Sequence, residues 1–177
     1  VNSLIVSSAS AFLTVMLTAC AAFAFSRLRF RGRRVGLLTI LLVQMFPALL
    51  LLVAIYLMLL NVGTTFPAVG LGTKAGLILV YLGGAIGVNT WLLKSFFDTL
   101  PRDLDESAVM DGASHAQIFF RIILPLAVPM LAVIFLLSFI ASINDFTVPN
   151  VLLAGNPNRY TLSVGLFNYV QGRSSRF

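Results

Sequence analysis

The acidic residues of this sequence are its first candidates for chemistry, because five of the six lie together between Asp98 and Asp111. A hydrolase would need a nucleophile with its base, or a set of metal ligands, beside such carboxylates. The chain has one histidine, His115, and one cysteine, Cys20, and neither has a neighbour that completes such a site. No Ser/His/Asp arrangement and no HExxH pattern occurs. We therefore expect no catalytic residue and no metal site.

The basic residues outnumber the acidic ones by 12 to 6, which gives a net charge of +6. They do not indicate a nucleic-acid surface, because no aromatic-plus-basic module accompanies them. Five of them fill one short gap between apolar runs: Arg27, Arg29, Arg31, Arg33 and Arg34. A basic cluster in such a place is typical of a membrane topology signal. The chain also lacks the G-x-x-x-x-G-K-[ST] loop that binds ATP phosphates, so we expect no ATP site of this kind on it.

The acidic segment carries the local signals of two short helices. Pro101 suits the first turn of a helix, and the acids that follow it favour the positive end of the helix dipole. Gly112 suits the position just after a helix C-terminus. Ser114 and Gln117 form an S-x-x-Q capping box that opens a second helix. We therefore predict a helix, a glycine turn and a second helix over residues 98–125.

Four long apolar stretches surround this segment, in a chain that is 59% hydrophobic and only 10% charged. They cover about residues 4–25, 35–60, 75–97 and 126–143. Each is long enough to cross a hydrocarbon core of about 30 Å, which takes about 20 helical residues. Because lipid leaves unpaired backbone groups unsatisfied, these stretches should be helices. The expected fold class is all-α, a polytopic membrane helix bundle that forms one domain over residues 1–177.

Glycines and prolines mark particular places in the expected spans. Gly83 and Gly87 form a GxxxG pattern in the third stretch, which we interpret as a site of close helix packing. Pro47 and Pro129 lie inside or near the ends of spans, where either can kink a helix. Asp145 follows the last stretch, where we expect hydrogen bonding at a helix end and not a buried pathway residue.

The basic residues also predict the orientation of the spans. If every stretch crosses, eight Lys and Arg residues lie on the side of segments 26–34 and 98–125, and four lie on the other side. Basic residues in short loops favour the cytoplasmic side. The segment 98–125 is then cytoplasmic, whereas both termini and the tail 145–177 are external. Because the chain starts at Val1 directly before an apolar run and has no closing span, we expect a fragment that lacks a helix at each end.

The spacing of the acidic segment resembles the EAA loop of bacterial ABC-importer permeases. In that loop Glu-Ala-Ala, a glycine and Ile-x-Leu-Pro hold fixed positions, and here Ser107 replaces the first alanine. The resemblance implies that this segment docks a cytoplasmic ATPase, with polar contacts from Glu106 and close approach at Ser107 and Ala108. The implied docking residues are Glu106, Ser107, Ala108, Asp111, Gly112, Ala113, Leu124 and Pro125. The alternative is an interfacial helix whose acids are merely solvated.

The resemblance extends over nearly the whole chain. Gln44-Met45-Phe46-Pro47 and Tyr81-Leu82-Gly83-Gly84 are similar to the smaller permease subunit of maltose/maltodextrin importers. The resemblance implies a multi-pass subunit of a bacterial inner membrane, with a six-helix core in the family. It also implies a second permease subunit, a pair of ATPase subunits that hold ATP, an external solute-binding protein, a sugar substrate, and no cofactor on this chain.

The solute and the external contacts have alternatives. The solute of such a permease could be another oligosaccharide, a polyol or a sugar phosphate. A further alternative is that the chain is a membrane protein with no transport role. In the maltose-type family a loop near the C-terminus enters the solute-binding protein. The equivalent here runs from Gly165 to about Arg173 and includes Tyr169 and Gln171. The alternative for it is an ordinary external loop.

Overall fold

A computed structural model describes residues 1–155 and 157–174, and all the regular structure in these ranges is helical. The predicted all-α fold class is therefore confirmed. The longer helices are α1 (Asn2–Arg27), α2 (Arg33–Gln44), α3 (Ala48–Thr65), α4 (Lys74–Thr99), α8 (Val128–Asn144) and α10 (Leu162–Ser174). The shorter ones are α5 (Asp103–Met110), α6 (His115–Ile118), α7 (Leu124–Leu126) and α9 (Thr147–Leu152). Residues 175–177 of the tail, with the Arg176 counted above as external, lie outside the described residues.

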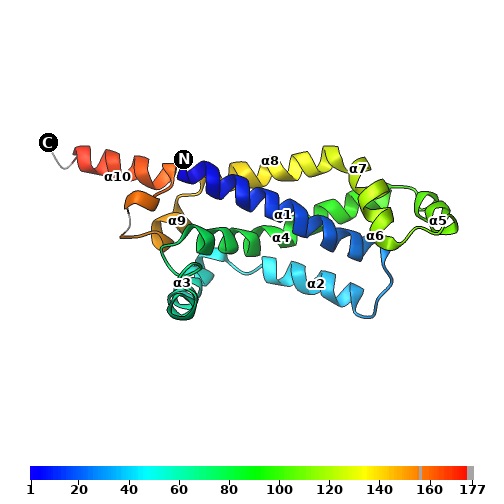
Figure 1. Cartoon of the computed structure of the whole chain (residues 1–177). Coiled ribbons are helices and arrows are strands. Elements are labelled where there is room, and N and C mark those ends of the chain that lie inside the picture. Colours follow the sequence, from blue (N-terminus) through cyan, green and yellow to red (C-terminus); the bar gives the residue numbers. More distant parts are fainter. Residues whose placement is uncertain (156, 175–177) are drawn as a thin grey trace.

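The helices α1, α4 and α8 lie side by side and run along the length of an elongated molecule (Figure 1). The short helices α5, α6 and α7 gather at one end of it, and α9, α10 and the N-terminus lie at the other. The helix α2 runs beside α4, whereas α3 is seen almost end-on and so crosses the direction of the others. The molecule thus has three long helices side by side, α8 antiparallel to α1 and α4, with the predicted docking segment at one end.

Two of the described helices, α1 and α4, are long and apolar enough to cross a membrane, and each has 26 residues. A third candidate is the pair His115–Leu126 and Val128–Asn144, which is bent by 74°. Four crossings were expected, with kinks allowed at Pro47 and Pro129, and the structure differs from four continuous spans at the second and fourth apolar stretches. Both differences have prolines as their physical cause.

The second apolar stretch is divided at Pro47, where one helix over residues 35–60 was expected. The helix α2 ends at Gln44, and α3 begins at Ala48 with Pro47 as its N-cap. Proline has no N–H to donate to the carbonyl of Val43, four residues earlier, and its ring clashes with that carbonyl. The direction of the chain therefore changes between α2 and α3.

The fourth stretch bends for the same reason. The five residues Phe119–Ile123 form a π-helical turn, in which the N–H of Leu124 bonds the carbonyl of Phe119. Pro125 and Pro129 follow, and each leaves a carbonyl one turn earlier without its usual donor. The bend between α7 and α8 therefore lies where two prolines interrupt the helical hydrogen bonds.

A stripe of small polar residues lets α1 approach its neighbours closely. Its buried members are Ser3, Ser7, Ser10, Thr14 and Thr18. The hydroxyl of Ser10 donates to the carbonyl of Val6 at 2.6 Å, and that of Thr18 donates to Thr14 at 2.7 Å. These hydroxyls are satisfied within their own helix, so they can be buried against α4 and α8 at low cost.

Candidate coupling site

The turn after α5 is built around Gly112. This residue has φ +81°, in the left-handed region where an L side chain is strained. The N–H of Ala113 bonds the carbonyl of Ala108, and the N–H of Gly112 bonds the carbonyl of Val109, both at 2.9 Å. These two bonds are those of a Schellman motif, which ends a helix and satisfies its last carbonyls. The predicted glycine turn is confirmed.

The second helix of the segment begins as its sequence predicts. The side chain of Gln117 accepts from the N–H of Ser114 at 2.8 Å, and the hydroxyl of Ser114 accepts from the N–H of Gln117 at 3.3 Å. This reciprocal pair is the predicted capping box. Pro101 differs from expectation, because it lies just before the N-cap Arg102 of α5 and not in its first turn.

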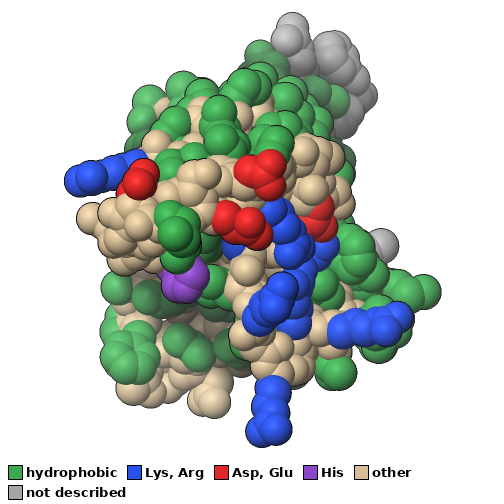
Figure 2. All heavy atoms as spheres, turned by 90° about the vertical axis from the view of Figure 1, so that its right-hand side faces the viewer, with side chains coloured by type: hydrophobic (Ala, Val, Ile, Leu, Met, Phe, Trp, Pro, Cys, Tyr) green, Lys and Arg blue, Asp and Glu red, His purple; other side chains and the backbone are tan. Residues whose placement is uncertain are grey.

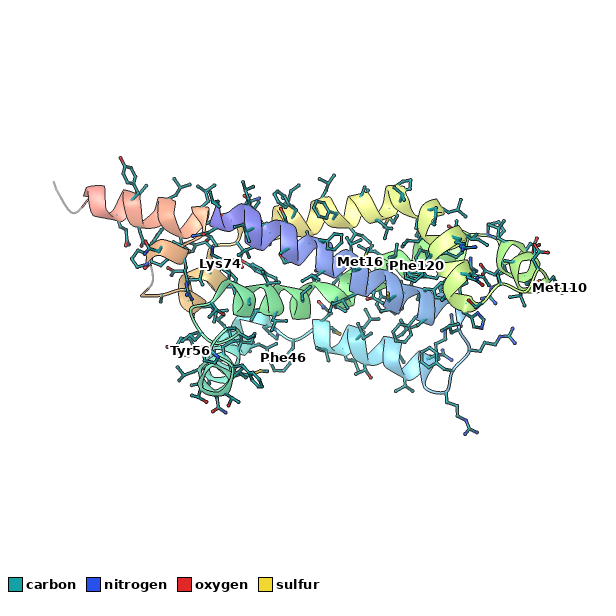
Figure 3. All side chains as sticks on the ribbon, viewed as in Figure 1. Met16, Phe46, Tyr56, Lys74, Met110 and Phe120 are labelled. Carbon is teal, nitrogen blue, oxygen red and sulfur yellow. The ribbon has the colours of Figure 1, made fainter. Side chains whose placement is uncertain are left out.

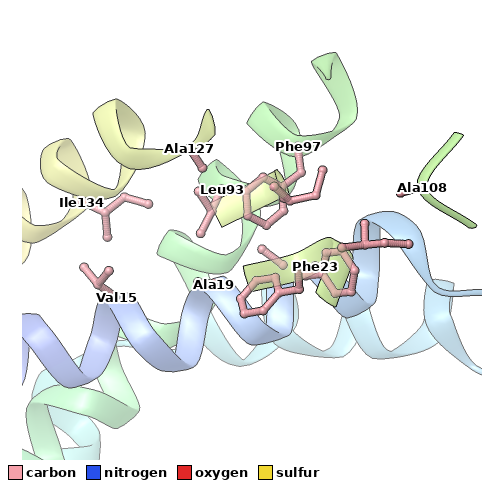
Figure 4. Close-up of a cluster of buried hydrophobic side chains, with 12 residues drawn as sticks. Val15, Ala19, Phe23, Leu93, Phe97, Ala108, Ala127 and Ile134 are labelled. Carbon is pink, nitrogen blue, oxygen red and sulfur yellow. The ribbon is translucent and has the colours of Figure 1, made fainter. Parts of the chain in front are cut away.

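The inner face of α5 is attached to the core through Ala108. This side chain is 9% exposed and belongs to a cluster of buried hydrophobic residues contributed by α1, α4, α8 and the segment between them (Figure 4). The cluster includes Phe23 of α1 and the fully buried Leu93 and Phe97 of α4. In this chain the side chain of Ala108 packs inward, and its predicted role in close approach to an ATPase stays a prediction.

The outer face of α5 forms an exposed ridge of three residues, Glu106, Ser107 and Met110. Residues three and four apart share a helix face, so these side chains point the same way. Met110 is 86% exposed and lies at the tip of the molecule (Figure 3). Leu104 and Val109 flank the ridge and are 40% and 51% exposed. Sequence reasoning did not single out Leu104, Val109 or Met110. Their solvent exposure on one short helix is the clearest sign of a docking surface.

The other predicted docking residues lie in different surroundings. Asp111 and Gly112 are exposed at the turn, beside the ridge. Ala113 and Leu124 are half-buried and pack against the hydrophobic cluster. Pro125 is exposed, but it lies in the bend that leads to α8. The structure thus brings four of the eight residues together at one surface, and three others, Ala108, Ala113 and Leu124, pack into or against the hydrophobic cluster.

An ion pair connects the inner side of α5 to α1. The Nε atom of Arg27 lies 2.9 Å from the Oδ2 atom of Asp105, and the two side chains are 6% and 18% exposed. Burial raises the pKa of the Asp105 carboxyl above its ordinary value, and the positive charges of Arg27 and Arg102 oppose that rise. Acidic and basic side chains lie next to one another over this end of the molecule (Figure 2). The acids of α5 are therefore not all solvated, since Asp105 is paired.

A second feature is an open cavity of about 850 Å³ between α1, α3, α4 and α8. Its walls are mostly apolar, but a few polar groups converge on it. The amide of Asn89 donates to the hydroxyl of Ser138 at 3.2 Å, and the hydroxyl of Tyr81 donates to Asp145 at 3.0 Å. Gln44 also lines it. Volumes of about 300–1,000 Å³ with few polar groups are typical of small-molecule sites.

The glycines of α4 shape this cavity. The predicted close packing holds at Gly87, where an added Cβ would lie 2.7 Å from Cγ of Gln44. The amide of Gln44 donates to the carbonyl of Gly84 at 2.9 Å. An added Cβ at Gly83 or Gly84 would meet nothing within 4 Å. Gly87 therefore makes room for the side chain of Gln44 from α2, whereas the surface of α4 at Gly83 and Gly84 stays open.

The region expected as an external loop is helical. Gly165, Tyr169 and Gln171 all lie on α10, at the opposite end from α5. The side chain of Asn2 donates to the carbonyls of Asn158 and Tyr160, which fixes the start of α10 against the N-terminus. Asp145 lies at the end of α8 and accepts from the N–H of Thr147, as expected for a helix end. Its expected separation from a pathway is not seen, because Asp145 also lines the cavity. Within residues 1–155 and 157–174 there is no group of three His, Cys, Asp or Glu able to hold a metal ion.

Comparison with known proteins identifies the class. Residues 14–171 match the family described as "Binding-protein-dependent transport system inner membrane component". The chain is 43% identical over 169 residues to the maltose/maltodextrin transport system permease protein MalG of Vibrio vulnificus. It is 44% identical over 169 residues to the MalG of Escherichia coli K12. Each match covers 96% of this chain and 56% of the relative.

A solved structure is also similar. It is described as the crystal structure of a bacterial ABC transporter involved in the import of the acidic polysaccharide alginate. The match has a TM-score of 0.78 and 25% identity, and it covers 94% of this chain and 55% of that chain. The present chain thus belongs to the family of binding-protein-dependent transport system inner membrane components, as the spacing of the acidic segment indicated. It spans about half the length of the relatives that it matches.

Proposed function

We propose that this chain is a permease subunit of an ATP-driven importer, and that α5 docks a cytoplasmic ATPase through the ridge Glu106, Ser107 and Met110. The observation that carries the proposal is the exposure of this ridge on a helix whose opposite side is buried. A helix held in this way presents a fixed surface at the end of the molecule. Its length and the glycine turn that ends it suit insertion into a complementary cleft.

The hydrophobic residues around the ridge support docking over a solvated helix. Leu104, Val109 and Met110 are exposed on one short helix, next to the polar Glu106 and Ser107. Burial of such a surface against a partner is favourable because it removes apolar area from water. A partner that covers it needs an apolar pocket with a hydrogen-bond donor for the carboxylate of Glu106.

The assignment of the remaining subunits follows from family membership. The complex would contain a second permease subunit, a pair of ATPase subunits that hold ATP, and an external solute-binding protein. The α5 end would then be cytoplasmic in a bacterial inner membrane. The α10 end, with Gly165, Tyr169 and Gln171, would face the solute-binding protein. ATP hydrolysis would take place on the partner, with no catalytic residue on this chain.

The solute that fits best is a neutral sugar of the maltose or maltodextrin type. The relatives from Vibrio vulnificus and Escherichia coli are maltose/maltodextrin permeases. The described cavity is lined by amide and hydroxyl groups, such as Asn89 and Ser138, and by one carboxylate, Asp145. Its described lining contains no Lys or Arg. An anionic solute such as a sugar phosphate or an acidic oligosaccharide would be repelled by Asp145 and would find no cation there.

Uptake by the reconstituted complex tests this proposal. We expect ATP-dependent uptake of radiolabelled maltose or maltotriose by vesicles that contain the intact protein, its ATPase, its second permease and its binding protein. Asn89→Leu should lower uptake about ten-fold, because a desolvated sugar hydroxyl would lose its partner. Asn61→Leu, on the exposed part of α3 outside the cavity lining, is the matched control.

Competition distinguishes the alternative solutes. An excess of an unlabelled neutral oligosaccharide should reduce uptake, whereas an alginate oligosaccharide or a sugar phosphate should not. Preferential uptake of an anionic solute would contradict the neutral-sugar assignment. Absence of ATP-dependent uptake of every solute class would contradict the transport function itself.

A further inference from the structure

The side chain of Arg27 connects three elements that are far apart in the sequence. It belongs to the last turn of α1, and its Nη2 atom donates to the carbonyl of Leu100 at 2.9 Å, in the link between α4 and α5. Its Nε atom lies 2.9 Å from the carboxylate of Asp105 on α5. The side chain is only 6% exposed. The guanidinium therefore holds the end of α1, the end of α4 and the start of α5 in one arrangement.

The attachment of α5 to the rest of the molecule otherwise depends on few groups. Ala108 is its one buried residue, and a methyl group provides little directional constraint. A planar guanidinium held by one hydrogen bond and one ion pair is more directional, because the hydrogen bond from Nη2 to Leu100 fixes an angle as well as a distance. The ion pair is also shielded from water, so it is weakened less by salt than a surface pair would be.

Neighbouring residues of α5 face opposite ways at this point. Glu106 belongs to the exposed ridge, whereas Asp105 points to Arg27. A displacement of the ridge thus moves the carboxylate of Asp105 directly. The helix α1 in turn reaches the cavity, where Ser10 and Thr14 form part of the wall. The ion pair thus attaches α5 to one end of α1, and the same helix carries Ser10 and Thr14 to the cavity wall.

We propose that the Arg27–Asp105 ion pair transmits movement of α5 to α1, which makes Arg27 a positioning residue for transport. This inference rests on the proposed function, because it needs an ATPase to move α5. It goes beyond docking, since it names the residues of this chain through which docking reaches the cavity. Loss of the pair should leave docking and ATP hydrolysis in place and should uncouple them from uptake.

The test measures ATP hydrolysis and uptake separately in the reconstituted complex of intact subunits. Arg27→Gln and Asp105→Asn should each lower the number of solute molecules imported per ATP. The expected decrease is about ten-fold, within the range typical of coupling between two sites. ATP hydrolysis should stay within about two-fold of the unaltered complex. Arg29→Gln removes an exposed arginine two residues away and should change neither quantity.

A charge swap separates coupling from a purely structural role. The double variant Arg27→Asp with Asp105→Arg restores opposite charges across the same gap, so it should recover much of the uptake per ATP lost in the single variants. If uptake per ATP stayed the same in every variant, whether or not both activities fell, the proposal would be overturned. Arg27→Lys keeps the charge but loses the two-partner geometry, and it should give an intermediate ratio even if Arg27→Gln does not assemble. Failure of the proposed function would be distinct, because the unaltered complex would then show no ATP-dependent uptake.

Discussion

Replacement of Ala108 by glutamate is expected to abolish ATP-driven uptake and to lower the free energy of unfolding by about 3 kcal/mol or more. The side chain of Ala108 is 9% exposed within a cluster that contains Phe23, Leu93 and Phe97. A carboxylate placed there would lose its hydration among apolar side chains, and Arg27 is already engaged by Asp105. The helix α5 must therefore leave the core or bury an unpaired charge.

The neighbouring substitution Ser107→Glu is the matched control for folding. Ser107 lies on the exposed ridge, so the same added carboxylate stays in water and should change the free energy of unfolding by less than about 0.5 kcal/mol. Unfolding by denaturing detergent in mixed micelles measures both variants. A stability loss of equal size at the two positions would contradict the inward orientation of Ala108.

The substitution Gly76→Ala is expected to destabilise the protein by about 1–3 kcal/mol, although alanine favours helices. Gly76 lies in the first turn of α4, where its N–H bonds the hydroxyl of the N-cap Thr73 at 3.0 Å. An added Cβ would lie 2.7 Å from the carbonyl oxygen of Val69 and 2.8 Å from that of Gly70. Both obstacles are backbone atoms, so relief of the clash requires α4 to move away from the preceding turn.

Gly83→Ala, in the same helix, is not expected to destabilise the protein. A Cβ there would meet nothing within 4 Å, so Gly83→Ala should be neutral or stabilise by up to about 1 kcal/mol. Thermal unfolding in detergent, followed for both variants at one pH and lipid content, compares them directly. A stabilising effect of Gly76→Ala would show that the turn before α4 is not packed as described.

The parts of the docking segment that could be predicted from sequence depend on hydrogen bonds within a few residues. The turn at Gly112 and the capping box of Ser114 and Gln117 are of this kind, because glycine after a helix and S-x-x-Q at its start satisfy backbone groups locally. Both are present in the structure as predicted. The all-α class was equally accessible, since lipid demands that apolar runs satisfy their own backbone.

The direction in which α5 faces could not be predicted in the same way. Eight residues make little more than two helical turns, too few for a hydrophobic period to define the buried side. Leu104 and Met110 are larger and more hydrophobic than Ala108, yet they are exposed and Ala108 is buried. Packing against α1 and α4 decided the orientation, and that packing depends on residues distant in the sequence. The ion pair of Arg27 with Asp105 could not be predicted either, because the two residues are far apart in the sequence.

The breaks within the apolar stretches, and the way the resulting helices cross, could not be predicted from composition. Composition indicated a span over residues 35–60, but the missing N–H of Pro47 divided it into α2 and α3. The cavity then arises because α3 crosses the other helices, an arrangement that no local pattern specifies. The segment from Gly165 to about Arg173 was likewise expected as a loop, by resemblance to the maltose-type family, and it lies on α10.

The central claim is that the exposed ridge of α5 contacts an ATPase subunit, and site-specific cross-linking tests it most directly. These 177 residues contain one cysteine, Cys20, so a Cys20→Ala background leaves an introduced thiol as the only one within them. We expect Met110→Cys or Glu106→Cys to cross-link to the ATPase in the intact complex, with a yield that changes when ATP is added. Leu166→Cys, 56% exposed on α10 at the other end of the molecule, should not cross-link to it. Absence of a cross-link from both ridge positions in every nucleotide state, with the complex assembled, would contradict the account.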